Sequence, residues 1–201
     1  MTIQASDILA VVLKSRPLPS LLELWIQRFE HHMIWPGPEG HPELVADERD
    51  RIVGYWLGQK HEPLPWLLML DDDMVPIAKT TPLVESERDI VSARCVTRAG
   101  HPAHEHHQFT AAAFKISREA ARKVGSPWFA SLSHNLGDQS SCECLRFWNR
   151  AVHAGLRPTQ AGIIGHRFPV TVFPDKIILF GDEPETAELL EQRLAAARQG
   201  A

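Results

Sequence analysis

A continuous apolar run, Pro65 to Leu70, ends directly in three consecutive aspartates, Asp71, Asp72 and Asp73. Such a run between helical segments is typical of a central strand that is covered on both faces. Ligands of open α/β sheets bind at the carboxyl ends of strands, so this strand would carry the three carboxylates to one fixed point. Neighbouring carboxylates repel each other and persist most readily beside a cation such as Mg²⁺ or Mn²⁺, which prefers oxygen ligands. The pattern favours a divalent-metal site, and the alternative is a solvated acidic turn.

The rest of the chain alternates between short apolar runs and segments with helical spacing. Ser20 and Ser117 stand where they can cap helices, and Gly125 and Gly155 follow helix ends. The alternation predicts an α/β fold with a largely parallel sheet. The predicted strands are residues 7–13, 33–35, 65–70, 89–93, 109–116, 161–164 and 170–173, and the predicted helices are 21–32, 43–59, 77–88, 118–124, 143–154 and 184–199.

Composition excludes several classes of function. The chain has 201 residues, with 21 basic and 25 acidic side chains and a net charge of −4. A mildly acidic chain is a poor candidate for a sequence-independent DNA binder, which needs a basic face, so we expect no nucleic-acid partner. It has no apolar run of about 18 residues that would form a membrane segment, and its N-terminus lacks the basic region of a secretory signal. Three cysteines, two of them in the C-x-C spacing of Cys142 and Cys144, do not make a disulfide framework. We expect one cytoplasmic domain over residues 1–201.

Two further features leave alternatives open. Four histidines, His101, His104, His106 and His107, crowd into one segment without the HExxH spacing of a zinc protease. They are compatible with a transition-metal site or with a solvated loop near an acceptor. Trp128 lies between a helix and an irregular segment, where it would either line a sugar pocket or pack in the core.

The segment PWLLMLDDDMVP resembles the metal-binding segment of GT-A fold glycosyltransferases, in which an apolar strand leads into a D-x-D motif. The resemblance extends over roughly residues 44 to 168 and is to bacterial and phage members of family-two type. The other matching segments are ELVADERDRIVGYWLGQ, DIVSARCVTR, CECLRFWNRAVHAGLRP and IIGHRF. The resemblance implies a GT-A-like, Rossmann-like three-layer α/β/α sandwich with a mostly parallel central sheet. It also implies transfer of a sugar from a nucleotide-sugar donor to an acceptor (a glycan, a protein or a small molecule), assisted by Mn²⁺ or Mg²⁺.

The resemblance assigns roles to individual residues. Asp71 and Asp73 match the D-x-D motif, so that Asp71 would approach the nucleotide ribose or the metal and Asp73 would ligate the metal. Asp72 fills the middle position and would share either task. His166 matches a histidine that completes the metal shell, and Arg49 matches an arginine that faces the nucleotide or the diphosphate. A cation and an arginine would stabilise the negative charge that develops on a departing diphosphate.

One position departs from the family pattern. The family carries an aspartate that acts as the base in inverting transfer, and Cys144 stands at that position here. Either Glu143 or Asp138 would then take the role of the base, provided that it lies near the acceptor hydroxyl. Two other functions are compatible with the same residues. The chain could bind a sugar nucleotide as an accessory domain without efficient transfer, or it could be a metal-dependent hydrolase or nucleotidyltransferase.

Overall fold

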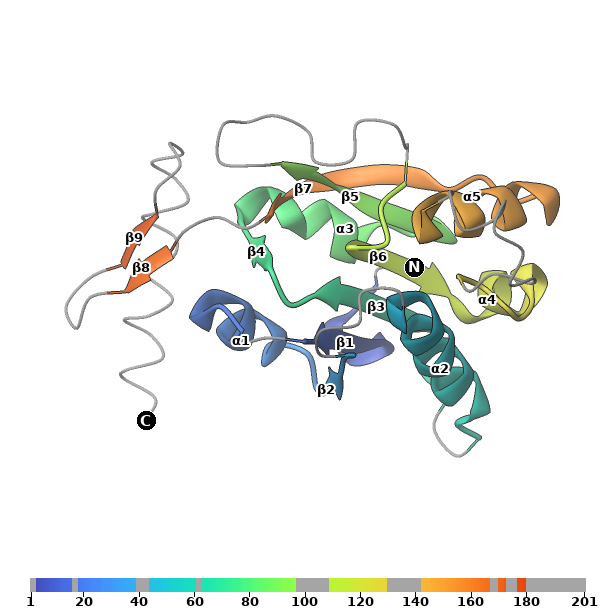
Figure 1. Ribbon diagram of the computed structural model, residues 1–201, viewed down its shortest axis with the longest axis horizontal. Coiled ribbons are helices and arrows are strands. Elements are labelled where there is room, and N and C mark those ends of the chain that lie inside the picture. The colour runs from blue at the N-terminus through green and yellow to red at the C-terminus, as the bar shows by residue number, and fades with distance from the viewer. Residues whose placement is uncertain are drawn as a thin grey trace.

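Seven strands form one mixed sheet in the order β2-β1-β3-β6-β5-β7-β4 (Figure 1). The structure is a computed structural model, and it describes residues 3–15, 18–38, 44–60, 63–96, 109–129, 142–166, 170–172 and 177–179. The pairings show that β1, β2, β3, β5 and β7 point the same way, whereas β4 and β6 are antiparallel to their neighbours. The strands are β1 (Ile8–Lys14), β2 (His31–Pro36), β3 (Trp66–Asp71), β4 (Met74–Pro76), β5 (Ile90–Val96), β6 (Ala113–Ser117) and β7 (Thr159–His166).

Helices cover both faces of this sheet (Figure 1). Strand β1 is buried on both faces: Leu9, Val11 and Leu13 pack in one apolar cluster, and the alternate residues pack in the other. The first cluster includes α2 (Val45–Gly58), α4 (Arg118–Val124) and α5 (Glu143–His153), and the second includes α1 (Ser20–Ile26) and α3 (Thr81–Glu85). The short 3-10 helices are η1 (Ala5–Asp7) and η3 (Ala78–Thr80), and β8 (Val170–Val172) pairs with β9 (Ile177–Leu179) in a separate sheet. This arrangement confirms the predicted α/β class and is consistent with a GT-A-like fold.

The sequence prediction differs from the structure in several places. The strand predicted over residues 109–116 begins only at Ala113, and β9 was not predicted. The helix predicted over residues 21–32 ends at Ile26, because His31 and His32 pair with β1 as the start of β2. Strand β4 was not predicted, since three residues are too few to show a periodic pattern. The helix predicted over residues 77–88 is divided into η3 and the shorter α3. The helix predicted over residues 184–199 lies outside the described residues. None of the helices that the structure describes is long and apolar enough to cross a membrane.

Helix α2 is fixed at several points, which matters because it carries Arg49. The buried Arg118 donates hydrogen bonds to the carbonyl oxygens of Trp56 (2.6 Å) and Leu57 (3.1 Å) in the last turn of α2, and to that of Leu64 (3.2 Å) just before β3. In the middle of the helix, Asp50 accepts hydrogen bonds from the backbone amides of Trp128 and Phe129. The Trp128 side chain is itself buried, and its indole nitrogen donates to the Ala121 carbonyl oxygen. The structure therefore places Trp128 in the core.

We predict that Gly162→Ala destabilises the fold strongly. Gly162 in β7 has a φ of +78°, and a Cβ there would lie 2.7 Å from the carbonyl oxygen of Lys79. Side chains rarely adopt this backbone conformation, and the clashing atom is backbone, so we expect a loss of about 2–4 kcal/mol of unfolding free energy. Urea denaturation measures the loss. The matched control is Gly54→Ala on the exposed face of α2, where a Cβ meets nothing within 4 Å and should stabilise the helix by up to about 1 kcal/mol. Equal effects of the two substitutions would contradict this account of β7.

Candidate functional site

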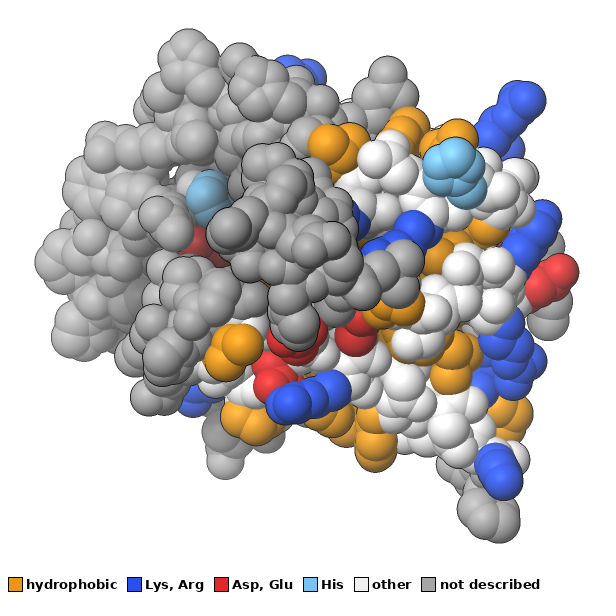
Figure 2. All heavy atoms as spheres, turned by 45° about the vertical axis from the view of Figure 1, so that its right-hand side comes forward, with side chains coloured by type: hydrophobic (Ala, Val, Ile, Leu, Met, Phe, Trp, Pro, Cys, Tyr) orange, Lys and Arg blue, Asp and Glu red, His pale blue; other side chains and the backbone are white. Residues whose placement is uncertain are grey.

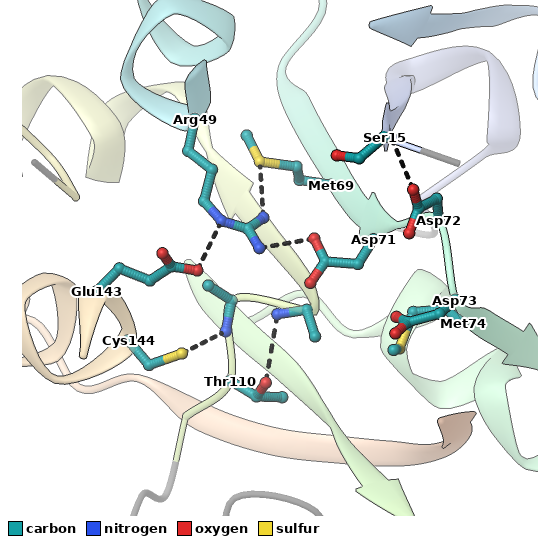
Figure 3. A network of polar contacts seen from close by, with 12 residues as sticks. Ser15, Arg49, Met69, Asp71, Asp72, Asp73, Met74, Thr110, Glu143 and Cys144 are labelled. Atoms are coloured by element: carbon teal, nitrogen blue, oxygen red, sulfur yellow. Dashed lines mark hydrogen bonds and ion pairs between the residues drawn. The ribbon is translucent and has the colours of Figure 1, made fainter. Parts of the chain in front are cut away.

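The three consecutive aspartates lie at the carboxyl end of β3, and their side chains point to three different elements (Figure 3). Asp71 contacts Arg49 of α2, Asp72 contacts the backbone at the end of β1, and Asp73 contacts His166 at the end of β7. Because β1, β3 and β7 run in the same direction, their carboxyl ends share one edge of the sheet. The aspartates thus contact α2, the end of β1 and the end of β7 at the edge at which ligands of such sheets bind.

Arg49 lies between two carboxylates from distant parts of the chain (Figure 3). Its Nη2 donates to Asp71 Oδ1 at 2.6 Å and its Nε donates to Glu143 Oε1 at 3.1 Å, while Nη1 lies 3.5 Å from the Met69 sulfur. The Arg49 side chain is 1% exposed, and those of Asp71 and Glu143 are 27% and 23% exposed. Arg49 therefore joins α2, β3 and α5. That Arg49 faces a nucleotide or diphosphate stays a prediction, and within the protein its guanidinium contacts these partners.

The environment shifts the pKa values of the central ion pair. Burial lowers the pKa of Arg49, but the carboxylates of Asp71 and Glu143 more than offset this and raise it above its usual value. Burial also raises the pKa of Asp71, and the guanidinium of Arg49 opposes the rise. Arg49 is thus held in its charged form. Its charge is the interaction that favours ionised Asp71 at this edge.

Asp72 is 4% exposed and has a contact that the sequence did not indicate. Its Oδ2 accepts a hydrogen bond from the backbone amide of Ser15 at 2.6 Å. We predicted that Asp72 shares the nucleotide or metal role, whereas the structure uses its carboxylate to join the end of β1 to the end of β3. A backbone amide carries no signal of its own in a sequence, so this contact of Ser15 was not predictable.

Asp73 and His166 meet because β4 pairs with β7. Met74 is the register partner of His166 in this antiparallel pair, so Asp73 lies at the same point of the sheet. Asp73 Oδ2 is 3.3 Å from His166 Nε2, and the two side chains are 11% and 20% exposed. These are an oxygen and a nitrogen ligand suitable for a divalent cation. Among the residues that the structure describes, no group of three or more histidine, cysteine, aspartate or glutamate side chains is arranged to hold a metal.

The residues considered for the base lie near the start of α5. Glu143 is the first residue of this helix and contacts Arg49, as described above. Cys144 is buried and points to the backbone, where its sulfur accepts a hydrogen bond from the Ala111 amide at 3.2 Å (Figure 3). A hydrogen bond with Cys142 and burial raise the pKa of the Cys144 thiol well above its usual value, so it is not available as a base. Asp138 and the histidines of residues 101–107 lie outside the described residues.

Charged side chains are unevenly distributed over the molecular surface. Figure 2 shows several Asp and Glu side chains near the middle of the view, beside a Lys or Arg side chain, and further Lys and Arg side chains toward its right-hand side. Apolar and uncharged side chains lie among the charged ones in this view.

Comparisons with known proteins give likeness in structure rather than in sequence. No protein-family model matches this sequence, and no curated protein matches it. The structure is similar to A197 from STIV, with a TM-score of 0.53 and 19% identity over 88% of this chain and 95% of that chain.

Two weaker likenesses are to glycosyltransferases. One is a Drosophila beta-1,4-galactosyltransferase 7 variant in complex with manganese, UDP-Gal and xylobiose (TM-score 0.47, 15% identity, 77% of this chain and 64% of that chain). The other is a glycosyltransferase involved in the glycosylation of the major capsid of PBCV-1 (TM-score 0.46, 13% identity, 78% and 80%). The likeness to A197 shows that this chain and A197 share a fold.

Proposed function

We propose that this chain is a metal-dependent glycosyltransferase that moves a sugar from a nucleotide-sugar donor to an acceptor hydroxyl. The observation that carries the proposal is the divergence of three consecutive aspartates at the carboxyl edge of the sheet, with Asp73 beside His166. The D-x-D resemblance of residues 65–76 supports the same function. Within this function we propose that Arg49 and Asp72 position other groups rather than contact the donor, which their contacts with Asp71, Glu143 and the Ser15 amide support.

Asp73 and His166 would hold the divalent ion, Mn²⁺ or Mg²⁺. Two protein ligands fit such an ion, because Mg²⁺ in phosphate chemistry is bound through one or two side chains and takes its remaining ligands from phosphates and water. The ion would neutralise charge that builds on the leaving nucleoside diphosphate. Asp71, oriented by Arg49, would accept a hydrogen bond from the nucleotide ribose. Asp72 would keep the end of β1 beside this group.

Glu143 or Asp138 would receive the proton of the acceptor hydroxyl while the acceptor oxygen attacks the anomeric carbon and the bond to the diphosphate breaks. This is a single inverting displacement. Oε1 of Glu143 accepts the hydrogen bond from Arg49, so the proton would go to Oε2 of the same carboxylate. Pairing with a guanidinium weakens a carboxylate as a base, and for that reason Asp138 is proposed alongside it.

A second candidate function is binding of a sugar nucleotide without transfer. The observation that favours it is the enclosure of Cys144 against the Ala111 amide, at the position where the family carries its base. The two functions differ in turnover and not in donor binding. Release of nucleoside diphosphate with sugar attached to an acceptor supports the transferase, whereas release of phosphate or pyrophosphate indicates a hydrolase or nucleotidyltransferase.

The test is a thermal-shift panel of UDP, GDP, CMP, dTDP and ADP, each with and without Mn²⁺. We expect one nucleotide to raise the Tm only when Mn²⁺ is present. A nucleotide concentration of about 100 times the dissociation constant adds about 2.7 kcal/mol to the free energy of unfolding. This corresponds to a rise in Tm of about 5–10 °C for a chain of this size. Asp73→Asn should abolish the Mn²⁺-dependent part. The matched control, Glu119→Gln, changes an exposed carboxylate in α4, at the opposite edge of the sheet, and should leave the shift unchanged. No shift with any nucleotide, from folded protein, would overturn the donor site.

A further inference from the structure

Cys142 and Cys144 form a close pair of thiols at the start of α5. Cys142 is the N-cap residue and is exposed, whereas Cys144 is 6% exposed, and both are reduced. Cys142 is the N-cap and Cys144 the second residue of the same helix, so both thiols belong to one turn, and the Cys142 thiol raises the pKa of the Cys144 thiol. The third cysteine, Cys95, lies in the apolar cluster on the α1 and α3 face of the sheet, whereas Cys144 lies in the cluster on the other face. The pair thus combines one sulfur that a small reagent reaches with a second, buried sulfur on the same turn of helix.

We propose that Cys142 and Cys144 are a modification site, at which exchange with a low-molecular-weight disulfide such as oxidised glutathione forms an intramolecular disulfide. The Cys142 thiolate attacks one sulfur of the reagent, which gives a mixed disulfide and one glutathione thiolate. Cys144 then attacks the Cys142 sulfur and displaces the second glutathione thiolate. The two protons of the protein thiols go to the two glutathiones. Two protein thiols are oxidised and one glutathione disulfide is reduced.

The order of the two steps follows from burial. The Cys142 sulfur is the one exposed to the reagent, and Cys144 is enclosed between α5 and the segment that precedes β6. The raised pKa of Cys144 keeps it protonated in the reduced protein, which agrees with its acting second. A disulfide needs the two sulfur atoms about 2.05 Å apart, and Cys142 and Cys144 lie within one turn of α5. Closing the bond requires the Cys144 sulfur to leave the Ala111 amide and turn toward Cys142.

Closing this bond changes the surroundings of the proposed transferase site. The Cys144 sulfur accepts from the Ala111 amide in the reduced protein and must turn toward Cys142 in the oxidised one. Glu143 lies between the two cysteines, and its carboxylate reaches Arg49 from the same turn of helix. Oxidation therefore displaces the Glu143 carboxylate relative to the Arg49 guanidinium and weakens the contact between them. This regulatory consequence rests on the proposed function, whereas formation of the disulfide does not.

The experiment treats the full chain with oxidised glutathione and follows intact mass, peptide mapping and alkylation of the remaining thiols. We expect the wild type to lose the mass of two hydrogen atoms, with the crosslink in the peptide that holds both cysteines, and dithiothreitol to reverse it. The control Cys95→Ser should oxidise as the wild type does. Cys142→Ser, a change at an exposed position, should not react, and Cys144→Ser should stop with one glutathione attached. Three alkylatable thiols after oxidation, or a wild-type protein that stops at the glutathione adduct, would overturn the modification site.

A second readout separates this inference from the proposed function. The nucleotide panel with Mn²⁺ is repeated on the reduced and oxidised wild type and on Cys142→Ser treated with oxidised glutathione. We expect a smaller thermal shift only in the oxidised wild type. Equal shifts in the reduced and oxidised protein would overturn the regulation and leave the disulfide intact. If the reduced protein shows no shift with any nucleotide, the proposed function fails, while the mass measurement still decides the disulfide.

Discussion

Arg49→Met is expected to lower the free energy of unfolding by about 3 kcal/mol. Removing one partner of a buried ion pair leaves an uncompensated charge and typically costs 3–5 kcal/mol. Here the substitution leaves two carboxylates, Asp71 and Glu143, without the guanidinium that both contact. The side chains of these two carboxylates are 27% and 23% exposed, so water partly solvates the charge that is left, and we expect the low end of that range. Equilibrium denaturation in urea, with an unchanged m value, measures the loss.

The matched control is Arg51→Met, two residues further along α2. The Arg51 side chain is 69% exposed and pairs with Glu48 at 2.5 Å. Exposed ion pairs contribute little, so its loss should cost less than about 1 kcal/mol. Arg49→Lys should recover only part of the stability, because a lysine cannot donate from two fixed nitrogens to two carboxylates. If Arg49→Met and Arg51→Met were equally stable, Arg49 would not hold the site together.

Glu143→Gln is expected to lower kcat by about 10²-fold or more if Glu143 is the base, the range that general-base catalysis supplies. The fold should survive, because the amide oxygen of glutamine still accepts from Arg49 Nε. The transfer assay uses the nucleotide identified by thermal shift as its sugar donor. Loss of a base also removes the fall in kcat/KM on the acidic side of the pH profile, which a merely structural effect would not do.

Asp138→Asn is the companion variant for the same assay. If Asp138 is the base, this variant shows the loss of kcat and the altered pH profile, and Glu143→Gln keeps the wild-type profile. Donor binding should remain in both variants. Wild-type kcat and pH profile in both would refute the assignment of either residue as the base, and transfer by a single inverting displacement would need another proton acceptor.

The amino-acid sequence predicted the longer strands and the edge that carries the site, because those depend on local patterns. The apolar runs of β1 and β3 are continuous since helices cover both faces, and the three aspartates follow β3 directly. The partners of those aspartates were not predictable in the same way. Arg49 contacts Asp71 across 22 positions of sequence and Glu143 across 94, and such contacts depend on how the helices pack.

The role of β4 is the clearest example of a missed element. Its three residues are too short to give a pattern, yet its pairing with β7 brings Asp73 to His166. The resemblance named both residues as metal ligands without any means of showing that they are neighbours. For Asp72 the position was predicted and the contact was not, because the partner is the backbone of Ser15.

The antiparallel direction of β6 determines where the chain can accept insertions or deletions without a shift in strand register. Strand β5 ends at Val96 and β6 begins at Ala113, which is the register partner of Leu70, so both ends of the intervening connection lie at the edge that carries Asp71. Each of the two strands is also anchored by another neighbour, β7 for β5 and β3 for β6. Insertions or deletions in residues 97–108 can therefore alter that connection without shifting any register in the sheet. The length of the chain between β5 and β6 can thus vary independently of Arg49 and of the carboxylates that it contacts.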